Sequence, residues 1–225
     1  MRRPAPIVSL IAAAAIAAAC GDAGPPVEAP AYLAFRDQPT ACGAEQPPVA
    51  TSMSFDAPAD MGIAAPVRVR MTTSCGDVVL ELDPAVAPIT VNSFVFLAEQ
   101  GYYDGTALHR VVPGFIVQAG DPNGGGGGDL PGYRLPDELP PPGYVYEQGV
   151  VAMANAGPNT SGSQFFITVA EVGLPPAYTV FGEVVEGLDT LARMMEVPLG
   201  LNPGLRENSR PLESIYLERV EVLDG

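Results

Sequence analysis

The stretch LHRVVPGFIVQAGD, residues 108–121, predicts two short strands joined by a turn at Pro113-Gly114. Alternate side chains of an extended segment share one face, so we expect Arg110 to lie on the same face as Leu108. An arginine on an apolar surface either extends its charged end into water or points at a ligand. The stretch therefore predicts a β structure that presents a single cation among apolar side chains.

The composition is typical of one turn-rich β domain with additional segments. The chain has 225 residues, 47% of them hydrophobic, with 25 glycines and 25 prolines. This length is sufficient for one sizeable core, and the hydrophobic content is too high for a disordered chain. The net charge of −15 argues against nucleic acid and anionic membrane surfaces as partners.

The pattern of residues over 1–20 predicts a bacterial lipoprotein signal peptide. Arg2 and Arg3 precede an apolar run over 7–19, which is too short to span a bilayer comfortably. The run ends in small residues directly before Cys20, the pattern in which a cysteine is lipidated and becomes the mature N-terminus. The alternatives are ordinary secretion with cleavage near Ala19 and an uncleaved anchor. In each case we expect an exported protein, and lipid on Cys20 would hold it on a membrane of the cell envelope.

Residues 21–65 predict a linker that holds the domain away from the membrane. They are rich in proline, alanine and glycine and show no sustained periodicity. Two aromatic residues, Tyr32 and Phe35, indicate either a short strand or packing onto the domain. Cys42 and Cys75 are candidates for a disulfide in an oxidising compartment; the alternative is two unrelated free thiols. No metal site is expected, because no CxxC motif exists and the chain has a single histidine.

Residues 66–225 predict a single mainly β domain. Apolar and polar residues alternate over 66–71 and return over 78–82, and further strands are predicted at 150–154, 163–169, 178–186 and 215–223. Helices are predicted at 88–100 and 187–195, and polar loops at 124–142 and 198–211, of which the glycines at 124–128 indicate a surface loop rather than a phosphate site. Many short strands with two helices predict a closed barrel with a helix at each end.

The polar residues of this domain contain no pair of a nucleophile and a base. The one histidine, His109, points away from Arg110 if the segment is extended, and we expect it to be structural. What remains is Arg110, three side-chain amides and several apolar residues. They indicate a binding site for an apolar peptide group, although ordinary core packing and turn formation would explain the same residues.

Three motifs resemble the cyclophilin-type peptidyl-prolyl cis-trans isomerases: HRVVPGFIVQAGD at 109–121, MANAGPNTSGSQFFI at 153–167 and VFG at 180–182. The resemblance covers residues 67–223. It implies a closed eight-stranded antiparallel barrel capped by two helices, no cofactor, and proline-containing polypeptides as substrates; we expect a monomer. Gly173 falls near a position that is often tryptophan in the family, which predicts weak cyclosporin binding.

The resemblance also implies a role for each site residue. Arg110 takes the position of the catalytic arginine. The proline pocket is expected to be lined by Phe115, Ile116, Phe166 and Leu174, with Tyr178 at its rim, and the substrate backbone to be held by Gln118, Ala154, Asn155 and Gln164. The expected function is an isomerase that assists the folding of exported or envelope proteins. The alternative is a module that binds proline-containing peptides as a chaperone, with incidental isomerase activity.

Overall fold

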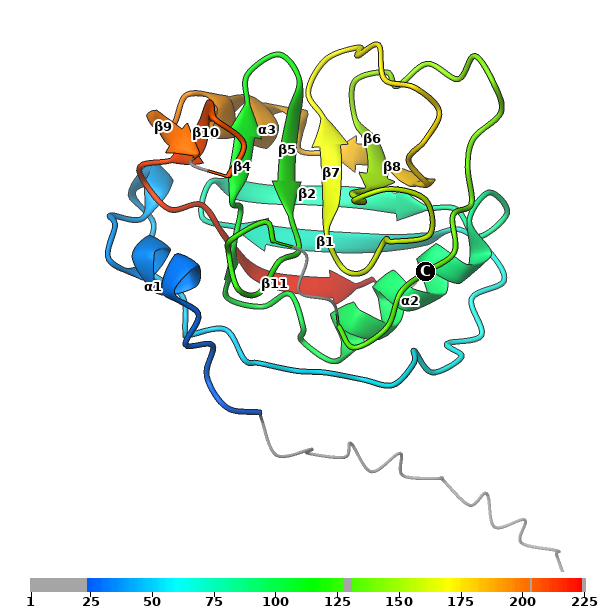
Figure 1. Ribbon diagram of the computed structural model, residues 1–225, viewed down its shortest axis with the longest axis horizontal. Helices are drawn as coiled ribbons and strands as arrows, with labels where there is room; N and C mark the ends of the chain where they lie inside the picture. The colour runs from blue at the N-terminus through cyan, green and yellow to red at the C-terminus, as the bar shows by residue number, and fades with distance from the viewer. Residues whose placement is uncertain (1–23, 128–130, 203, 224–225) are drawn as a thin grey trace, which may run out of the picture.

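A curled antiparallel sheet of nine strands forms the body of the computed structural model, which describes residues 24–127, 131–202 and 204–223 (Figure 1). The strands follow the order β3-β11-β1-β2-β8-β6-β7-β5-β4. Their bounds are β1 Val67–Thr73, β2 Gly76–Leu82, β3 Thr106–Ala107, β4 Arg110–Val112, β5 Ile116–Ala119, β6 Val150–Met153, β7 Phe165–Thr168, β8 Val180–Glu186 and β11 Tyr216–Val222.

The mainly β antiparallel fold predicted from the sequence is confirmed, with two differences in how the sheet closes. The structure has nine strand segments where eight were expected, and the sheet is curled rather than fully closed. β3 and β4 stand at its two ends, and no ladder joins them within the described part of the chain. Only Leu108 and His109 separate these strands, so the chain itself connects the two edges.

Two helices fill the ends of the curled sheet, as predicted. α2 (Pro88–Glu99) begins with a proline, whose fixed φ suits the first turn, and it buries Val91 and Phe94 in the main core. α3 (Leu188–Met195) contributes Leu191 and Met194 to the same core. The apolar residues of these helices meet the inward side chains of the strands, because helical and strand periodicity each direct one face inward.

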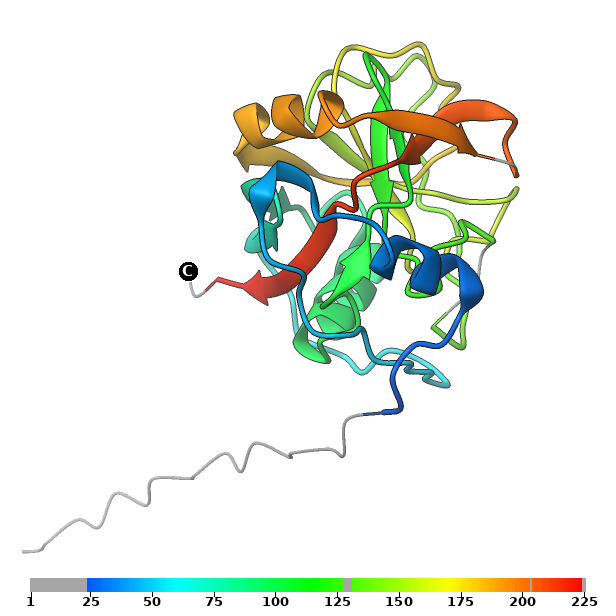
Figure 2. The ribbon, with the colours of Figure 1, turned by 90° about the vertical axis from the view of Figure 1, so that its left-hand side faces the viewer.

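Residues 24–65, which were expected to be a linker, pack along the outside of the sheet (Figures 1 and 2). Of the two alternatives for Tyr32 and Phe35, packing onto the domain is the one observed. A short helix, α1 (Pro30–Arg36), buries Tyr32 and Phe35 completely or nearly so. The hydroxyl of Tyr32 donates to the carbonyl of Gly105 at 2.9 Å and accepts from the amide of Ala50 at 2.8 Å. The aromatic side chains of this segment supply the apolar surface that packs it against the domain, despite its proline-rich composition.

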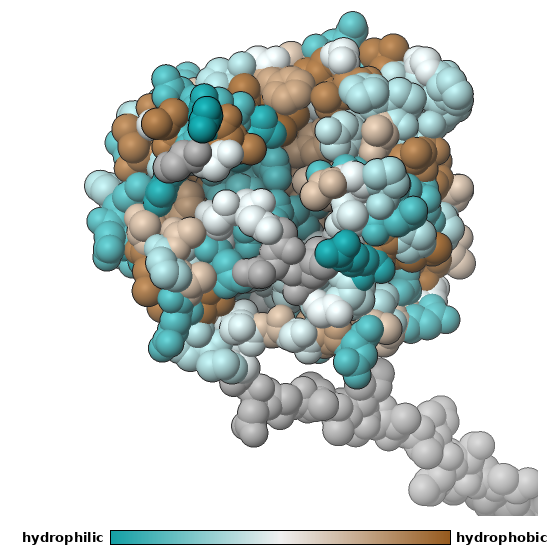
Figure 3. All heavy atoms as spheres, in the orientation of Figure 1, coloured by the Kyte–Doolittle hydropathy of each residue, from teal (hydrophilic) through white to brown (hydrophobic). Residues whose placement is uncertain are grey.

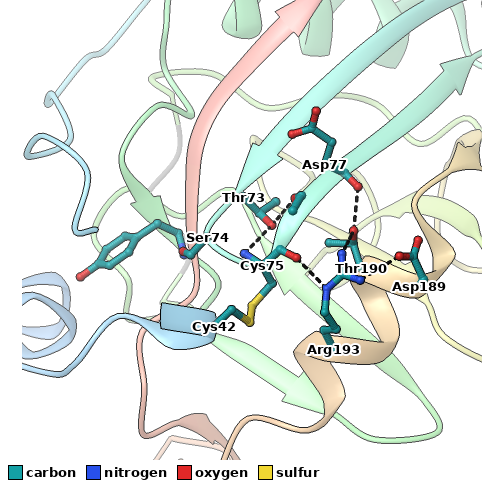
Figure 4. Close-up of a disulfide and its surroundings, with 10 residues drawn as sticks. Cys42, Thr73, Ser74, Cys75, Asp77, Asp189, Thr190 and Arg193 are labelled. Atoms are coloured by element: carbon teal, nitrogen blue, oxygen red, sulfur yellow. Dashed lines mark hydrogen bonds and ion pairs between the residues drawn. A yellow bond between two sulfur atoms is a disulfide. The ribbon is translucent and has the colours of Figure 1, made fainter. Parts of the chain in front are cut away.

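A disulfide between Cys42 and Cys75 joins this segment to the turn between β1 and β2 (Figure 4). Cys42 belongs to a single 3₁₀ turn, Ala41–Gly43. Arg193 of α3 reaches the same turn, and its Nε donates to the carbonyl of Cys75 at 2.9 Å. The N-terminal segment, the first hairpin and α3 therefore meet at one point. Cys20 and the predicted signal peptide lie outside the described residues.

The polar loop predicted at 198–211 contains a separate hairpin. Its strands are β9 (Leu199–Asn202) and β10 (Glu207–Pro211), which pair with each other and not with the main sheet. The hairpin lies beside β4, at the open edge of the sheet (Figure 1). Figure 3 shows hydrophobic surface over this hairpin. Two leucines of the hairpin, Leu201 and Leu205, are 61% and 55% exposed. Within the described ranges, no helix is long and apolar enough to cross a membrane.

Candidate active site

A cavity of about 730 Å³ opens over the strands β4, β5 and β7. All of the residues that the sequence predicted for the site line it: Arg110, Phe115, Ile116, Gln118, Ala154, Asn155, Gln164, Phe166, Leu174 and Tyr178. Residues from the 109–118 stretch thus meet residues from 154–178. The sheet brings them together because β5 pairs with both β4 and β7.

A row of polar side chains crosses the floor of this cavity. Arg110 lies opposite Gln118 in the register of β4 and β5, and its Nη1 donates to Oε1 of Gln118 at 3.2 Å. The amide of Gln118 in turn donates to Oε1 of Gln164 at 3.0 Å. Each group fixes the next, so the guanidinium is held by a chain of hydrogen bonds.

An apolar wall stands beside this polar row. Ile116 and Phe166 are each 3% exposed as residues, and they belong to a small hydrophobic cluster separate from the main core. Tyr178 packs edge-on against Phe166, with ring centroids 5.4 Å apart and an interplanar angle of 87°, an arrangement that aromatic pairs favour. Phe115 and Leu174 are partly buried against the same cluster. The wall is therefore a shallow apolar recess next to a cation.

The loop after β6 forms the third side of the cavity. The amide of Ala154 donates to the carbonyl of Gln164 at 2.9 Å, which extends the pairing of β6 and β7 by one residue. The side chain of Asn155 donates to the carbonyl of Ala177 at 2.9 Å and accepts from the amide of Gly157 at 3.2 Å. Its amide group therefore fastens two loops together, although the residue lines the cavity.

Sequence reasoning missed Glu207, which binds Arg110 from the β9–β10 hairpin. Nε of Arg110 donates to Oε1 of Glu207 at 2.6 Å, and Nη2 donates to Oε2 at 3.3 Å. The side chains of Arg110 and Glu207 are 19% and 34% exposed. The hydrogen bond from Arg110 lowers the pKa of Glu207, so its carboxylate is charged at neutral pH. Nothing in the sequence pairs these two residues, which are 97 positions apart.

Other residues of the cavity rim were also missed. They are His109, Gly125, Gly126, Gly127, Arg134, Ala156, Thr160, Gly162, Ser163, Asn202, Gly204 and Leu205. The motif at 153–167 already contains four of these positions, and three glycines of the predicted surface loop, Gly125, Gly126 and Gly127, line the cavity while being exposed. Asn202, Gly204 and Leu205 come from the hairpin and carry no local sequence signal.

His109 is buried, as expected for a structural histidine. It is 4% exposed, and neither ring nitrogen has a hydrogen-bond partner among the residues that the structure describes. Burial, and after it the charge of Arg110, lowers the pKa of His109 to about 4. The imidazole is therefore neutral at physiological pH and is not placed to act as a base toward a serine or cysteine.

The cavity combines a hydrogen-bond donor of fixed orientation with an apolar recess. Among the described residues, the one histidine of the cavity makes no hydrogen bond to a nucleophile, and no group of three metal-binding side chains occurs. Such a site is suited to chemistry in which a bound group changes its electron distribution without breaking a bond.

The comparisons with known proteins agree with this geometry. Residues 68–222 match the family model of the cyclophilin type peptidyl-prolyl cis-trans isomerases. The chain is 45% identical over 161 residues to the peptidyl-prolyl cis-trans isomerase ppi1 of Schizosaccharomyces pombe, covering 69% of this chain and 99% of that protein. It is 40% identical over 160 residues to the peptidyl-prolyl cis-trans isomerase-like 1 of Gibberella zeae, covering 70% and 95%.

Solved structures show the same fold. A cyclophilin type isomerase of Cryptosporidium parvum superposes with a TM-score of 0.64 at 33% identity, over 71% of this chain and 99% of that one. A second crystal structure of that protein, determined in the presence of the dipeptide Ala-Pro, gives a TM-score of 0.63 at 34% identity, over 70% and 99%. The chain therefore belongs to the cyclophilin-type peptidyl-prolyl cis-trans isomerases, enzymes that accelerate rotation about the bond preceding proline.

Proposed function

We propose that Arg110 is the catalytic residue of this isomerase and that it acts on the nitrogen of the substrate proline. Rotation of a peptide bond is slow because the C–N bond has partial double-bond character, with a barrier of ~18–20 kcal/mol. Twisting the bond localises a lone pair on nitrogen. A guanidinium N–H directed at that lone pair stabilises the twisted form more than the planar one, which lowers the barrier without any bond being broken.

The apolar recess supplies the second requirement, an anchored proline ring. Phe115, Ile116, Phe166 and Leu174 would surround the ring, so that the acyl side of the bond rotates while the ring stays fixed. The amide side chain of Gln164 and the main chain at Ala154 and Asn155 would hold the flanking peptide. The related Cryptosporidium protein, crystallised in the presence of Ala-Pro, supports a proline-containing peptide as the ligand. An acceleration of about 10⁵-fold would require about 7 kcal/mol, shared between donor and pocket.

The test is an isomerase assay on an X-Pro peptide with the wild type and the Arg110→Ala variant. We expect the variant to lose about 100-fold or more in kcat/KM, since a preorganised transition-state donor contributes on this scale. Arg219→Ala is the matched control, because Arg219 also pairs with a glutamate, Glu221, but is 66% exposed on β11. Equal rates for Arg110→Ala and the wild type, at equal thermal stability, would refute the role of Arg110.

We further propose that the enzyme works outside the cytoplasm on exported proteins, tethered by lipid on Cys20. Arg2 and Arg3, the apolar run at 7–19 and the small residues before Cys20 support export and lipidation. The disulfide between Cys42 and Cys75 supports an oxidising compartment as well. Envelope proteins with X-Pro bonds are then the clients.

Fractionation of a bacterial host expressing the full chain tests this location. We expect the wild type in the membrane fraction with a lipid mass on the mature N-terminus, and Cys20→Ser in the soluble exported fraction or uncleaved. Wild-type protein in the cytoplasm would contradict export. Wild-type protein in the soluble exported fraction would contradict lipidation but not export.

A chaperone role without turnover predicts that Arg110→Ala still suppresses aggregation of a proline-rich client, which the same preparations can measure.

A further inference from the structure

The β9–β10 hairpin covers the side of Arg110 that the sheet leaves open. β4 is the last strand of the sheet and pairs only with β5, so its outer edge has no strand partner in the described sheet. β10 lies against this edge. Glu207, the first residue of β10, is thereby placed beside Arg110, the first residue of β4.

The hairpin is itself fastened to the rest of the molecule. The guanidinium of Arg210 lies 4.7 Å from the ring centroid of Phe35 in α1, a stacking contact between β10 and the N-terminal segment. The amide of Leu212 donates to the carbonyl of Pro198 at 2.8 Å, which closes the base of the hairpin. Glu207 therefore projects from a supported element rather than from a free loop.

The contacts of Arg110 leave only its terminal nitrogens available to a substrate. A guanidinium has five N–H bonds. Glu207 accepts from Nε and from Nη2, and Gln118 accepts from Nη1. The hydrogen bonds in the described structure thus leave one N–H on each of Nη1 and Nη2, in a residue that lines the cavity. A carboxylate bound across Nε and Nη2 also fixes the plane of the group, because both pairs of donors and acceptors are planar.

We propose that Glu207 is a positioning residue for the isomerase reaction, which holds the guanidinium of Arg110 in the plane that directs a terminal N–H at the substrate nitrogen. A long arginine side chain loses rotational freedom when it adopts one pose. Glu207 and Gln118 impose that pose before the substrate arrives, so the transition state does not have to. This inference rests on the proposed role of Arg110.

The test compares Glu207→Ala and Glu207→Gln in kcat, KM and thermal stability on an X-Pro peptide. We expect Glu207→Ala to lower kcat about tenfold, with KM within about twofold, because misorientation acts on the transition state and not on binding of the proline ring. Glu207→Gln retains an oxygen that accepts from Nε and is expected to recover most of that loss. Glu221→Ala, which removes a 33% exposed carboxylate from another arginine ion pair, is the matched control and should leave kcat unchanged.

The double variant Glu207→Ala/Arg110→Ala separates positioning from a structural effect. If Glu207 acts through Arg110, its removal has no further effect on the residual rate of Arg110→Ala. An equal loss in both backgrounds would overturn the proposal, as would a wild-type kcat for Glu207→Ala. A higher kcat for Glu207→Ala would also overturn it, since Glu207 would then compete with the substrate for the guanidinium. An active wild type with an unaffected Glu207→Ala refutes positioning alone, whereas an unaffected Arg110→Ala refutes the role of Arg110 itself.

Discussion

Gln118 stands between the cation of the site and the amide of Gln164, and it connects residues that the sequence had already grouped. It accepts from Arg110 and donates to Gln164, so its two ends have opposite and defined roles. A side chain with this pattern orients its neighbours even if it contributes little binding energy of its own. Substitutions of single residues at this site are therefore expected to act through the orientation and protonation of side chains more than through side-chain volume.

Replacement of Gln118 by leucine keeps most of the side-chain volume and removes both hydrogen bonds. We expect kcat/KM to fall about tenfold, the equivalent of about 1.5 kcal/mol for a lost hydrogen bond to a charged group. The measurement is steady-state kinetics on an X-Pro peptide. Gln148→Leu removes an exposed amide, which donates to the carbonyl of Val169 at 3.2 Å, and should leave the rate unchanged. Equal losses in both variants would show that the effect is not specific to Arg110.

His109 predicts how stability depends on pH. Its pKa in the folded state is lowered to about 4 from 6.5, so the unfolded chain takes up the proton first as the pH falls. The stability contributed by the neutral ring is complete above about pH 6.5 and is lost between there and pH 4. Between pH 7 and 4.5 the wild type should lose about 2–3 kcal/mol more than His109→Gln, as measured by denaturant unfolding. Identical declines would show that His109 is not the group responsible.

At the scale of elements, the sequence predicts the helices and turns that have a local pattern. It misses the elements that depend on contacts between residues far apart in the chain. The helices at 88–100 and 187–195 have apolar residues at helical spacing, and they occur within a residue of those bounds. The motif at 109–121 contains its own turn, where Gly114 has a φ of +72°. The hairpin over 199–211 has no such pattern, and it is stabilised by contacts with β4 and α1 that only the folded chain provides.

The same difference between local patterns and distant contacts explains which residues of the candidate site could be predicted from the sequence. All the predicted members line one cavity, because Arg110, Ile116, Gln118 and Phe166 lie on the paired strands β4, β5 and β7 and the others lie on the turns and loops beside these strands. Glu207 was missed because its partner is far away in the sequence, and a glutamate in a polar loop indicates nothing by itself. Likewise, the prolines and glycines of the N-terminal segment suggest a linker and give no sign of the helix α1, although Tyr32 and Phe35, which α1 buries, were candidates for packing onto the domain.

The packing of α1 predicts that substitutions of two adjacent residues, Tyr32 and Leu33, differ in their effect on the stability of the protein. Tyr32→Phe leaves the ring in place but deprives the amide of Ala50 and the carbonyl of Gly105 of their buried partner. We expect a loss of about 1–3 kcal/mol in the free energy of unfolding, measured in urea. Leu33→Ala in the same helix is the control, because Leu33 is 42% exposed and its truncation should cost less than about 0.5 kcal/mol. An unaffected Tyr32→Phe would indicate that the N-terminal segment does not pack on the barrel in solution.

At the scale of the whole molecule, one covalent bond joins the N-terminal segment to the domain that the family model matches. The disulfide links Cys42, before the matched residues 68–222, to Cys75 within them, with a sequence separation of 33. The bond closes a loop that contains most of the connection between α1 and β1. Because α1 supports the hairpin that carries Glu207, the redox state of the compartment and the geometry of the site are physically connected.

Reduction of this bond should lower the stability of the protein by about 3–4 kcal/mol, the entropy that a loop of this length returns to the unfolded chain. For a domain of this size that corresponds to a fall in Tm of about 6–16 °C. The measurement is thermal unfolding of the mature protein with and without a thiol reductant. Cys42→Ser/Cys75→Ser is the control, expected to unfold at the lower temperature in both conditions. A wild type whose Tm does not respond to reductant would mean that the two thiols are free, and the compartment argument would then rest on the N-terminal signal alone.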